Sequence, residues 1–295
     1  MKKILALDGG GVRVYFQLLI LQEIEKKTGK QIVDIFDYFA GVSASSIILS
    51  AILTKYSLSE ILDLFKVKSK DMFFRSYVYM FRSGLGLFNS KYPDYFIEKA
   101  LKELFDEILL YECKKPLVIL TYDMKHSTPL CFSSYKNYFN YFEIWKVIRG
   151  STSAPTYFPP FQLDNYLLVD GGMVTNNLSE MSFINAMEHF GSEKEFMELS
   201  IGTGYSLQEH NARGLIGWSS SIFDVLFRAN SLYEMEILKK LSKFENLKKF
   251  YRLDFKMEKD IYLDDYNAFG KMDEIFKQWL EDNDDYLTQI ANELV

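Results

Sequence analysis

Residues 35–53 read IFDYFAGVSASSIILSAIL, and this stretch decides the fold. The apolar run over residues 35–40 predicts a strand, and the apolar run over residues 45–53 predicts a buried helix. Ser43 falls on the turn between them. A serine on such a sharp strand-to-helix turn is held with its hydroxyl exposed, as a nucleophile must be. The stretch therefore predicts an α/β fold that presents Ser43 at the end of a strand.

The neighbours of Ser43 have to be small for this turn to form. In a nucleophile elbow the residues two before and two after the serine nearly touch, and glycine is usual at both positions. Here they are Gly41 and Ser45. Ser45 adds a hydroxymethyl group, so we expect it to crowd the elbow. The helix that follows would direct its N-terminal amides, and the positive end of its dipole, toward the reacting atoms.

A run of three glycines lies upstream of the elbow. Residues 3–7 (KILAL) predict a short strand, and Val14, Leu18 and Leu21 begin a helical stripe. Between them stands Asp8-Gly9-Gly10-Gly11-Val12-Arg13. Consecutive glycines adopt backbone conformations that other residues avoid, and they leave N–H groups free to face an anion. The loop is a candidate phosphate cradle or a candidate oxyanion hole for an ester under attack.

An aspartate ends another predicted strand. The apolar residues 166–169 (YLLV) are followed by Asp170, Gly171 and Gly172. Ligands of α/β sheets gather at the carboxyl ends of strands. A serine hydroxyl is a poor nucleophile until a neighbouring group accepts its proton. Asp170 is therefore the predicted partner of Ser43.

A histidine base is the alternative to Asp170. The chain has three histidines, His126, His189 and His210. A Ser…Asp…His order would match an α/β-hydrolase triad. The elbow of that fold follows several strands, however, whereas Ser43 follows only one or two predicted strands. None of the histidines stands in a glycine-flanked loop after a clear strand, so we favour direct proton transfer to the aspartate.

The composition is that of an ordinary globular protein. Of the 295 residues, 48% are hydrophobic and 25% are charged, and no linker or repeat divides the chain. Strands alternating with helices predict a three-layer α/β/α fold with a mostly parallel central sheet. The net charge of −6 argues against a nucleic-acid partner, which requires a basic face. Cys113 and Cys131 have neither metal-binding nor redox spacing. We expect no metal and no cofactor.

The segment 66–91 is basic and rich in aromatic residues. Such a segment suits a membrane surface, with its charges at the phosphates and its rings in the interfacial layer. The candidate lid or docking residues are Lys68, Lys70, Phe73, Phe74 and Arg75. The alternative is an insertion that packs its aromatic side chains onto the body of the protein.

The glycine loop, the elbow and the aspartate, in this order, resemble the motifs of the patatin-like phospholipase family. The resemblance covers residues 3–205 and extends to residues 151–158 (STSAPTYF), Asn176, Asn177 and residues 202–204 (GTG). Ser45, Ser46 and Leu178 depart from the residues usual in the family. The resemblance implies a catalytic core over residues 1–205 and a mainly helical C-terminal part, residues 206–295, packed on the same domain.

By this resemblance the chain is a bacterial-type lipid acyl hydrolase. It implies that Ser43 is the nucleophile, that Asp170 is the base, and that the amides of Gly9, Gly10 and Gly11 hold the oxyanion. The supporting motif residues are Asp8, Arg13, Gly41, Ser45, Gly171 and Gly172. The implied substrate is a membrane phospholipid at a bilayer surface, which would lose a fatty acid through an acyl-enzyme.

Two alternatives to a constitutive hydrolase stay open. The first alternative is a catalytically weak or regulated effector of the same fold, because some proteins resembling this chain are antiviral phospholipases that a small cyclic nucleotide activates. A phosphate-binding kinase or ATPase is the other, although the glycine loop lacks the lysine of a P-loop.

No signal peptide or long apolar span is visible after Met1. We expect a cytoplasmic protein that is peripheral to membranes, while export without a signal peptide and the oligomeric state stay open.

Overall fold

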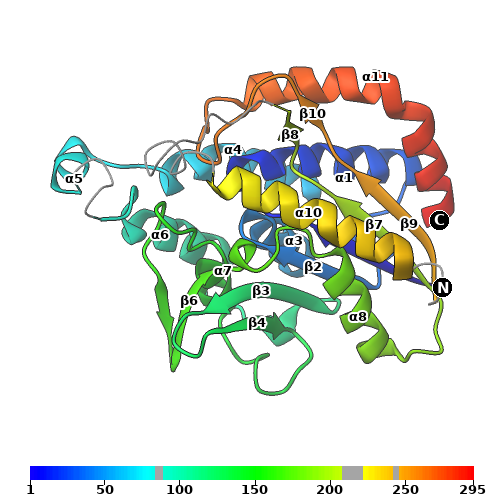
Figure 1. The fold of residues 1–295 in the computed structure, drawn as a ribbon, viewed down its shortest axis with the longest axis horizontal. Coiled ribbons are helices and arrows are strands. Elements are labelled where there is room, and N and C mark those ends of the chain that lie inside the picture. Colours follow the sequence, from blue (N-terminus) through cyan, green and yellow to red (C-terminus); the bar gives the residue numbers. More distant parts are fainter. Residues whose placement is uncertain (84–88, 208–221, 242–245) are drawn as a thin grey trace.

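A mostly parallel sheet forms the centre of the molecule (Figure 1). The computed structural model describes residues 1–83, 89–207, 222–241 and 246–295. Five strands run parallel in the order β3 (Leu117–Asp123), β2 (Tyr38–Val42), β1 (Lys2–Leu7), β7 (Phe196–Ile201) and β9 (Leu247–Leu253). Three more strands, each antiparallel to the strand it pairs with, extend the β3 edge: β4 (Thr128–Ser133), β5 (Phe161–Leu163) and β6 (Tyr166–Asp170).

Helices cover both faces of this sheet because its strands alternate their apolar side chains between the faces. In β1, Leu5 and Leu7 belong to one buried cluster and Ile4 belongs to the other. The first cluster packs under α1 (Tyr15–Thr28), α3 (Ala44–Thr54), α4 (Leu58–Met72), α6 (Asp94–Phe105), α7 (Ile144–Ser151) and α11 (Phe269–Leu294). The second packs under α8 (Ser179–Phe190) and α10 (Ile222–Leu241). The predicted three-layer α/β architecture is confirmed.

The remaining elements are short. They are α2 (Ile32–Ile35), α5 (Tyr77–Arg82), β8 (Tyr205–Ser206), β10 (Lys256–Met257) and the 3-10 turns η1 (Gly11–Val14), η3 (Leu110–Glu112) and η4 (Gly171–Met173). None of the described helices combines the length and the apolar character needed to cross a bilayer.

The strand predicted over residues 35–40 begins later than the apolar run suggested. Ile32 and Ile35 are buried on the single turn of α2, which ends before the strand. The Asp37 carboxylate then accepts a hydrogen bond from the amide of Lys3 at 2.9 Å, which aligns the chain with β1. The strand therefore starts at Tyr38 and runs to Val42, directly before Ser43.

Two strands of the sheet end against each other along one edge of β3. β4 occupies the other edge of β3, opposite residues Val118 to Asp123. On the shared edge, Val42 at the end of β2 pairs with Leu120, and Asp170 at the end of the antiparallel β6 pairs with Thr121. The carboxyl ends of β2 and β6 therefore meet at neighbouring positions of β3.

The described residues beyond 205 belong to the same body. They supply β9, which pairs with β7 along its whole length, and α11, which packs against α1. The sequence indicated a mainly helical C-terminal part and did not predict the strand β9.

Candidate active site

Ser43 stands alone between β2 and α3, on a strained backbone. Its φ and ψ are 57° and −135°, a backbone conformation that residues other than glycine rarely adopt. The turn also requires glycine at position 41, because a Cβ there would lie 2.9 Å from Leu49 Cδ1 and 3.1 Å from Ser45 Oγ. The geometry is that of a nucleophile elbow.

Ser45 fits beneath this turn instead of obstructing it. Its side chain is fully buried, and its Oγ accepts a hydrogen bond from the amide of Val42 at 2.9 Å. The same hydroxyl lies 3.0 Å from the carbonyl oxygen of Leu7, to which it can donate. Ser45 thus ties the end of β2 to the end of β1, a role that glycine could not perform.

Asp170 lies against Ser43. Ser43 Oγ donates to Asp170 Oδ2 at 2.6 Å, and the amide of Gly172 donates to Asp170 Oδ1 at 2.8 Å. Gly171 permits this approach, because a Cβ at that position would lie 2.3 Å from the carbonyl oxygen of Leu120. The meeting of β2 and β6 on β3 thus becomes a serine–carboxylate hydrogen bond.

Burial makes Asp170 a stronger base than an ordinary aspartate. Desolvation raises its pKa to about 6, while the hydrogen bonds from Ser43 and Gly172 oppose that shift. The carboxyl is therefore mostly ionised at pH 7 and is matched to accept a proton near neutrality.

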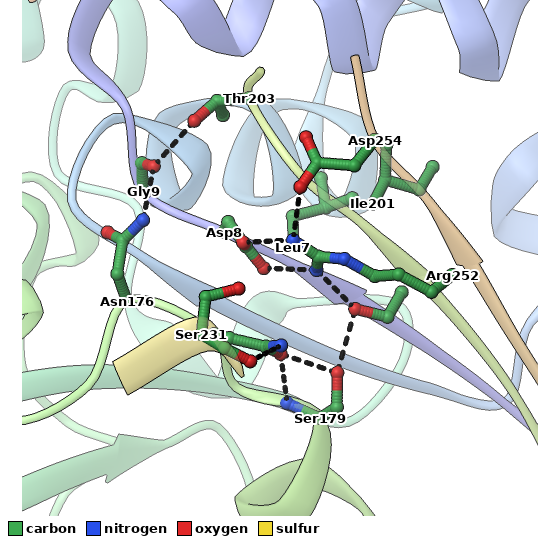
Figure 2. A network of polar contacts seen from close by, with 12 residues as sticks. Leu7, Asp8, Gly9, Asn176, Ser179, Ile201, Thr203, Ser231, Arg252 and Asp254 are labelled. Atoms are coloured by element: carbon green, nitrogen blue, oxygen red, sulfur yellow. Dashed lines mark hydrogen bonds and ion pairs between the residues drawn. The ribbon is translucent and has the colours of Figure 1, made fainter. Parts of the chain in front are cut away.

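The three loop glycines occupy different positions. The carbonyl oxygen of Gly9 accepts hydrogen bonds from Asn176 Nδ2 at 2.9 Å and from Thr203 Oγ1 at 3.0 Å (Figure 2). The amide of Gly9 donates to the carbonyl of Asn176 at 3.4 Å. The amides of Gly10 and Gly11, in contrast, have no hydrogen-bond acceptor within the described residues.

Ser43 opens into a narrow apolar cavity of about 60 Å³. Gly10, Gly11 and Asp170 line its polar end. Its apolar wall is formed by Ile47, Phe65, Met72, Phe73, Ile97 and Phe158. The structure thus brings the predicted serine, aspartate and two of the three glycines to one cavity with an apolar wall.

The histidines stand apart from this cavity. His126 is paired with Asp123, and His189 packs against Tyr135 with ring centroids 4.2 Å apart. His210 lies outside the described residues. No histidine of the described chain lines the cavity of Ser43.

A second, larger cavity of about 450 Å³ adjoins the first, and Asn176 and Phe227 line both. Arg13 lines it with a side chain that is only 6% exposed. The Arg13 Nε atom is buried without a hydrogen-bond partner in the described part of the chain. An unsatisfied N–H on a buried guanidinium is unfavourable.

Asp8 is held by a residue that the sequence did not single out. Arg252 of β9 donates to both carboxylate oxygens of Asp8, at 2.8 Å and 2.6 Å (Figure 2). Burial raises the pKa of Asp8 to about 6, and Arg252 opposes the shift. The only sequence signal for this pair is a charged residue, Arg252, inside a partly buried strand.

The candidate lid residues are placed in different surroundings. Phe73 lines the cavity of Ser43, Lys68 is paired with Glu103, and the Arg75 guanidinium lies 5.5 Å from the ring centre of Tyr92. Lys70 is exposed, and Phe74 packs edge-on against Phe96.

The next element, α5, stands away from the body (Figure 1), and its Tyr77 and Phe81 are each 89% exposed, the largest values among the large hydrophobic side chains described. Residues 84–88 of the basic segment lie outside the described residues.

No group of three or more histidine, cysteine or acidic side chains suited to a metal ion is found in the described part of the chain.

Comparison with known proteins identifies relatives over most of the chain. A family model described as patatin-like phospholipase matches residues 5–184. Calcium-independent phospholipase A2-gamma of Rattus norvegicus is 26% identical over 312 residues, which cover 98% of this chain and 40% of that protein. Patatin-like protein 4 of Arabidopsis thaliana is 27% identical over 277 residues, which cover 77% of this chain and 69% of that protein.

The chain spans about 40% of the length of the rat relative. Among solved structures, VipD from Legionella pneumophila has a TM-score of 0.49 at 13% identity, over 94% of this chain and 67% of that one.

Proposed function

The chain belongs to the patatin-like phospholipase family, and from this premise we propose that it is a lipid acyl hydrolase with Ser43 as nucleophile and Asp170 as general base. The observation that carries the proposal is the 2.6 Å hydrogen bond from Ser43 Oγ to Asp170 Oδ2 at the polar end of an apolar cavity. A buried carboxylate with a pKa of about 6 can accept the serine proton at neutral pH.

The reaction proceeds by two acyl transfers. Asp170 takes the proton of Ser43 as Oγ attacks the ester carbonyl, and the protonated aspartate then donates to the departing alcohol. This leaves the acyl group on Ser43. A water molecule, deprotonated by the same carboxylate, attacks the acyl carbonyl. The bond between the acyl carbon and Ser43 Oγ then breaks, Asp170 returns the proton to Oγ, and the fatty acid leaves.

The oxyanion of each tetrahedral intermediate is held by the amides of Gly10 and Gly11. The Gly9 carbonyl is bound by Asn176 and Thr203, and no described peptide bond is cis. In a trans peptide the N–H of the next residue points away from the carbonyl, so the Gly10 amide faces away from those two side chains. Gly10 and Gly11 both line the cavity of Ser43, and such donors contribute about 10²–10³-fold in rate.

The two adjoining cavities support a phospholipid as substrate. The apolar wall beside Ser43 suits an acyl chain, and Arg13, which lines the neighbouring cavity, supplies a positive charge for a phosphate. The rat relative is a phospholipase A2 by name, which agrees with this substrate class. Because the acyl cavity is only about 60 Å³, α4 and Phe73 have to move before a long chain enters.

One set of variants tests the proposal. Ser43→Ala is expected to abolish fluorophosphonate labelling and the hydrolysis of both a labelled phospholipid and p-nitrophenyl butyrate. Asp170→Asn is expected to fold normally and to lose about 10²–10⁴-fold in turnover. Arg13→Gln is expected to impair phospholipid hydrolysis more than hydrolysis of the short ester, which has no phosphate.

Ser59→Ala, at an exposed serine of α4, is the control and should behave as the wild type. Equal labelling and equal turnover of the wild type and Ser43→Ala would remove the proposal. An equal loss on both substrates in Arg13→Gln would remove its phosphate-binding part.

A further inference from the structure

Arg252 is a nearly buried cation whose contacts lead to the glycine loop. Its side chain is 10% exposed and extends from β9, beyond the residues matched by the family model. Besides its two bonds to Asp8, it donates to Ser200 Oγ at 2.7 Å and to Asp254 Oδ2 at 3.0 Å. Figure 2 shows the guanidinium between the two carboxylates, next to the strand that leads into the loop.

The first route from Arg252 to the glycine loop is direct. Asp8 immediately precedes Gly9, and its two carboxylate oxygens receive parallel hydrogen bonds from the two terminal nitrogens of Arg252. A bidentate pair of this kind restricts the orientation of the carboxylate as well as its distance. The backbone of Asp8 is held as well, since its carbonyl accepts a hydrogen bond from Gln17 Nε2 at 2.8 Å.

The second route runs through Asp254 and Thr203. Asp254 Oδ1 accepts a hydrogen bond from the amide of Gly204 at 2.9 Å, which fixes the turn that carries Thr203. Thr203 in turn donates to the Gly9 carbonyl. It also backs Gly10 closely, because a Cβ at that glycine would lie 2.4 Å from Thr203 Oγ1.

We infer that Arg252 is a positioning residue for the oxyanion loop, acting through Asp8 and through the Asp254–Thr203 turn. The inference rests on the proposed function, because it assigns Arg252 to the reaction of Ser43. Three consecutive glycines have little conformational preference of their own. Oxyanion donors, however, stabilise the transition state only when they are already in place. Arg252 supplies from outside the rigidity that the loop sequence lacks.

An ordinary structural ion pair would contact the same atoms, so the test has to separate the two roles. Replacing Arg252 alone leaves Asp8 as an unpaired buried charge, which destabilises any fold. Replacing both members by neutral amides, in Asp8→Asn with Arg252→Gln, removes the unpaired charge at Asp8. Asp254 also loses its bond to Arg252 in this variant, but its side chain is 17% exposed and keeps the hydrogen bond from the Gly204 amide. The double replacement does not restore the bidentate, charge-assisted clamp.

The experiment measures kcat, KM and the inhibition constant of a trifluoromethyl ketone, a mimic of the tetrahedral intermediate, on a soluble ester. For the double variant we expect a folded protein with a kcat about 10- to 100-fold lower and little change in KM. The affinity for the ketone should fall in proportion to kcat/KM. Arg252→Lys, which keeps the charge but donates from one nitrogen, should lie between the double variant and the wild type.

Lys249→Gln is the matched control. Lys249 lies on the same strand and forms a surface ion pair with Glu293 at 2.5 Å, remote from the loop, so this variant should keep the kcat of the wild type. The inference would be overturned if the double variant had the kcat and the ketone affinity of the wild type. It would also be overturned if Arg252→Lys had the kcat of the wild type. If the double variant does not fold, Arg252→Lys decides alone. Ser43→Ala, measured alongside, keeps the tests distinct, because an active Ser43→Ala overturns the proposed function and an active double variant overturns only the role of Arg252.

Discussion

Asp170 obtains its basicity from burial and its orientation from two hydrogen bonds. One carboxylate oxygen accepts a hydrogen bond from Ser43 Oγ and the other accepts one from the amide of Gly172, so the carboxylate cannot rotate freely. Desolvation raises its pKa to about 6, and those two donors keep the pKa from rising further. The same burial that raises the pKa of this proposed base makes its charged form costly in the folded protein.

The pH dependence of activity should report this carboxyl. Only the ionised form of Asp170 accepts the proton of Ser43, so kcat/KM is expected to rise with pH and to reach half its plateau near pH 6. A profile measured on a soluble ester between pH 4 and pH 9 checks this. A half-point near pH 4, the value of an exposed aspartate, would contradict the assignment.

Stability should change in the opposite direction over the same range. Between pH 3.8 and pH 6 the unfolded chain loses the Asp170 proton before the folded protein does, so ionisation of this group lowers the free energy of unfolding as pH rises. Asp170→Asn cannot ionise, and it is therefore expected to be more stable than the wild type at pH 7, by up to about 3 kcal/mol. Urea titrations at pH 4 and pH 7 measure the difference, which should be small at pH 4.

At the scale of elements, α4 lines the cavity of Ser43, and α5 follows it in the chain on the outside of the molecule. The C-terminal half of α4 lines the cavity through Phe65, Ser69 and Met72. Five positions after Met72 begins α5, whose Tyr77, Val78 and Phe81 are exposed. Exposed apolar side chains on a short helix suit a lipid surface, and Arg75 just before α5 and Arg82 at its end carry the positive charge that suits phosphates. We propose α5 as the part of the basic segment that contacts the bilayer.

Replacing the exposed apolar residues of α5 tests this proposal. The triple variant Tyr77→Ser, Val78→Ser, Phe81→Ser is expected to bind anionic phospholipid vesicles at least about tenfold more weakly, because each ring or branched chain withdrawn from the interface costs binding free energy. Hydrolysis of a soluble ester should be unchanged. Vesicle co-sedimentation measures the binding.

The control for α5 replaces exposed aromatic residues at another place on the surface. Tyr138→Ser with Tyr141→Ser removes two rings that are also exposed, between β4 and α7. If this control weakens vesicle binding as much as the α5 variant does, α5 has no special role in docking.

For the whole molecule, the C-terminal part is a component of the body. β9 extends the parallel sheet beyond β7, and α11 packs on α1, with Leu287, Ile290 and Leu294 in the main core. Arg252 and Asp254, which brace the glycine loop, come from this part as well. The proposed reaction therefore involves residues of the part that the sequence predicted to be mainly helical.

A core substitution in α11 measures how much this part contributes to the stability of the fold. Leu287→Ala removes a fully buried side chain and is expected to lower the free energy of unfolding by about 2–5 kcal/mol. Gln278→Ala, at an exposed position of the same helix, should stay within about 0.5 kcal/mol of the wild type. Equal stability of the two variants in urea titrations would mean that α11 is not part of the cooperative unit.

The sequence by itself determined the features that depend on neighbouring residues. Apolar periodicity predicted the β strand before Ser43, the helix after it and the α/β class, because burial imposes that periodicity. The motif order predicted Ser43 and Asp170 as partners. The bend at Asp37, the start of β2 at Tyr38 and the strand β9 were not predicted, because contacts with other strands decide them.

Only the tertiary structure decided which groups meet. The junction of β2 and β6 on β3 places Ser43 beside Asp170, although 127 positions separate them in the chain. Ser45 looked like an obstacle in the sequence, whereas in the fold its hydroxyl joins β1 to β2. The clamp of Asp8 by Arg252 spans 244 positions, and no local pattern predicts it. A sequence pattern records how a residue suits its neighbours in the chain, whereas hydrogen bonds and ion pairs require a short distance in space, which only the folded sheet provides.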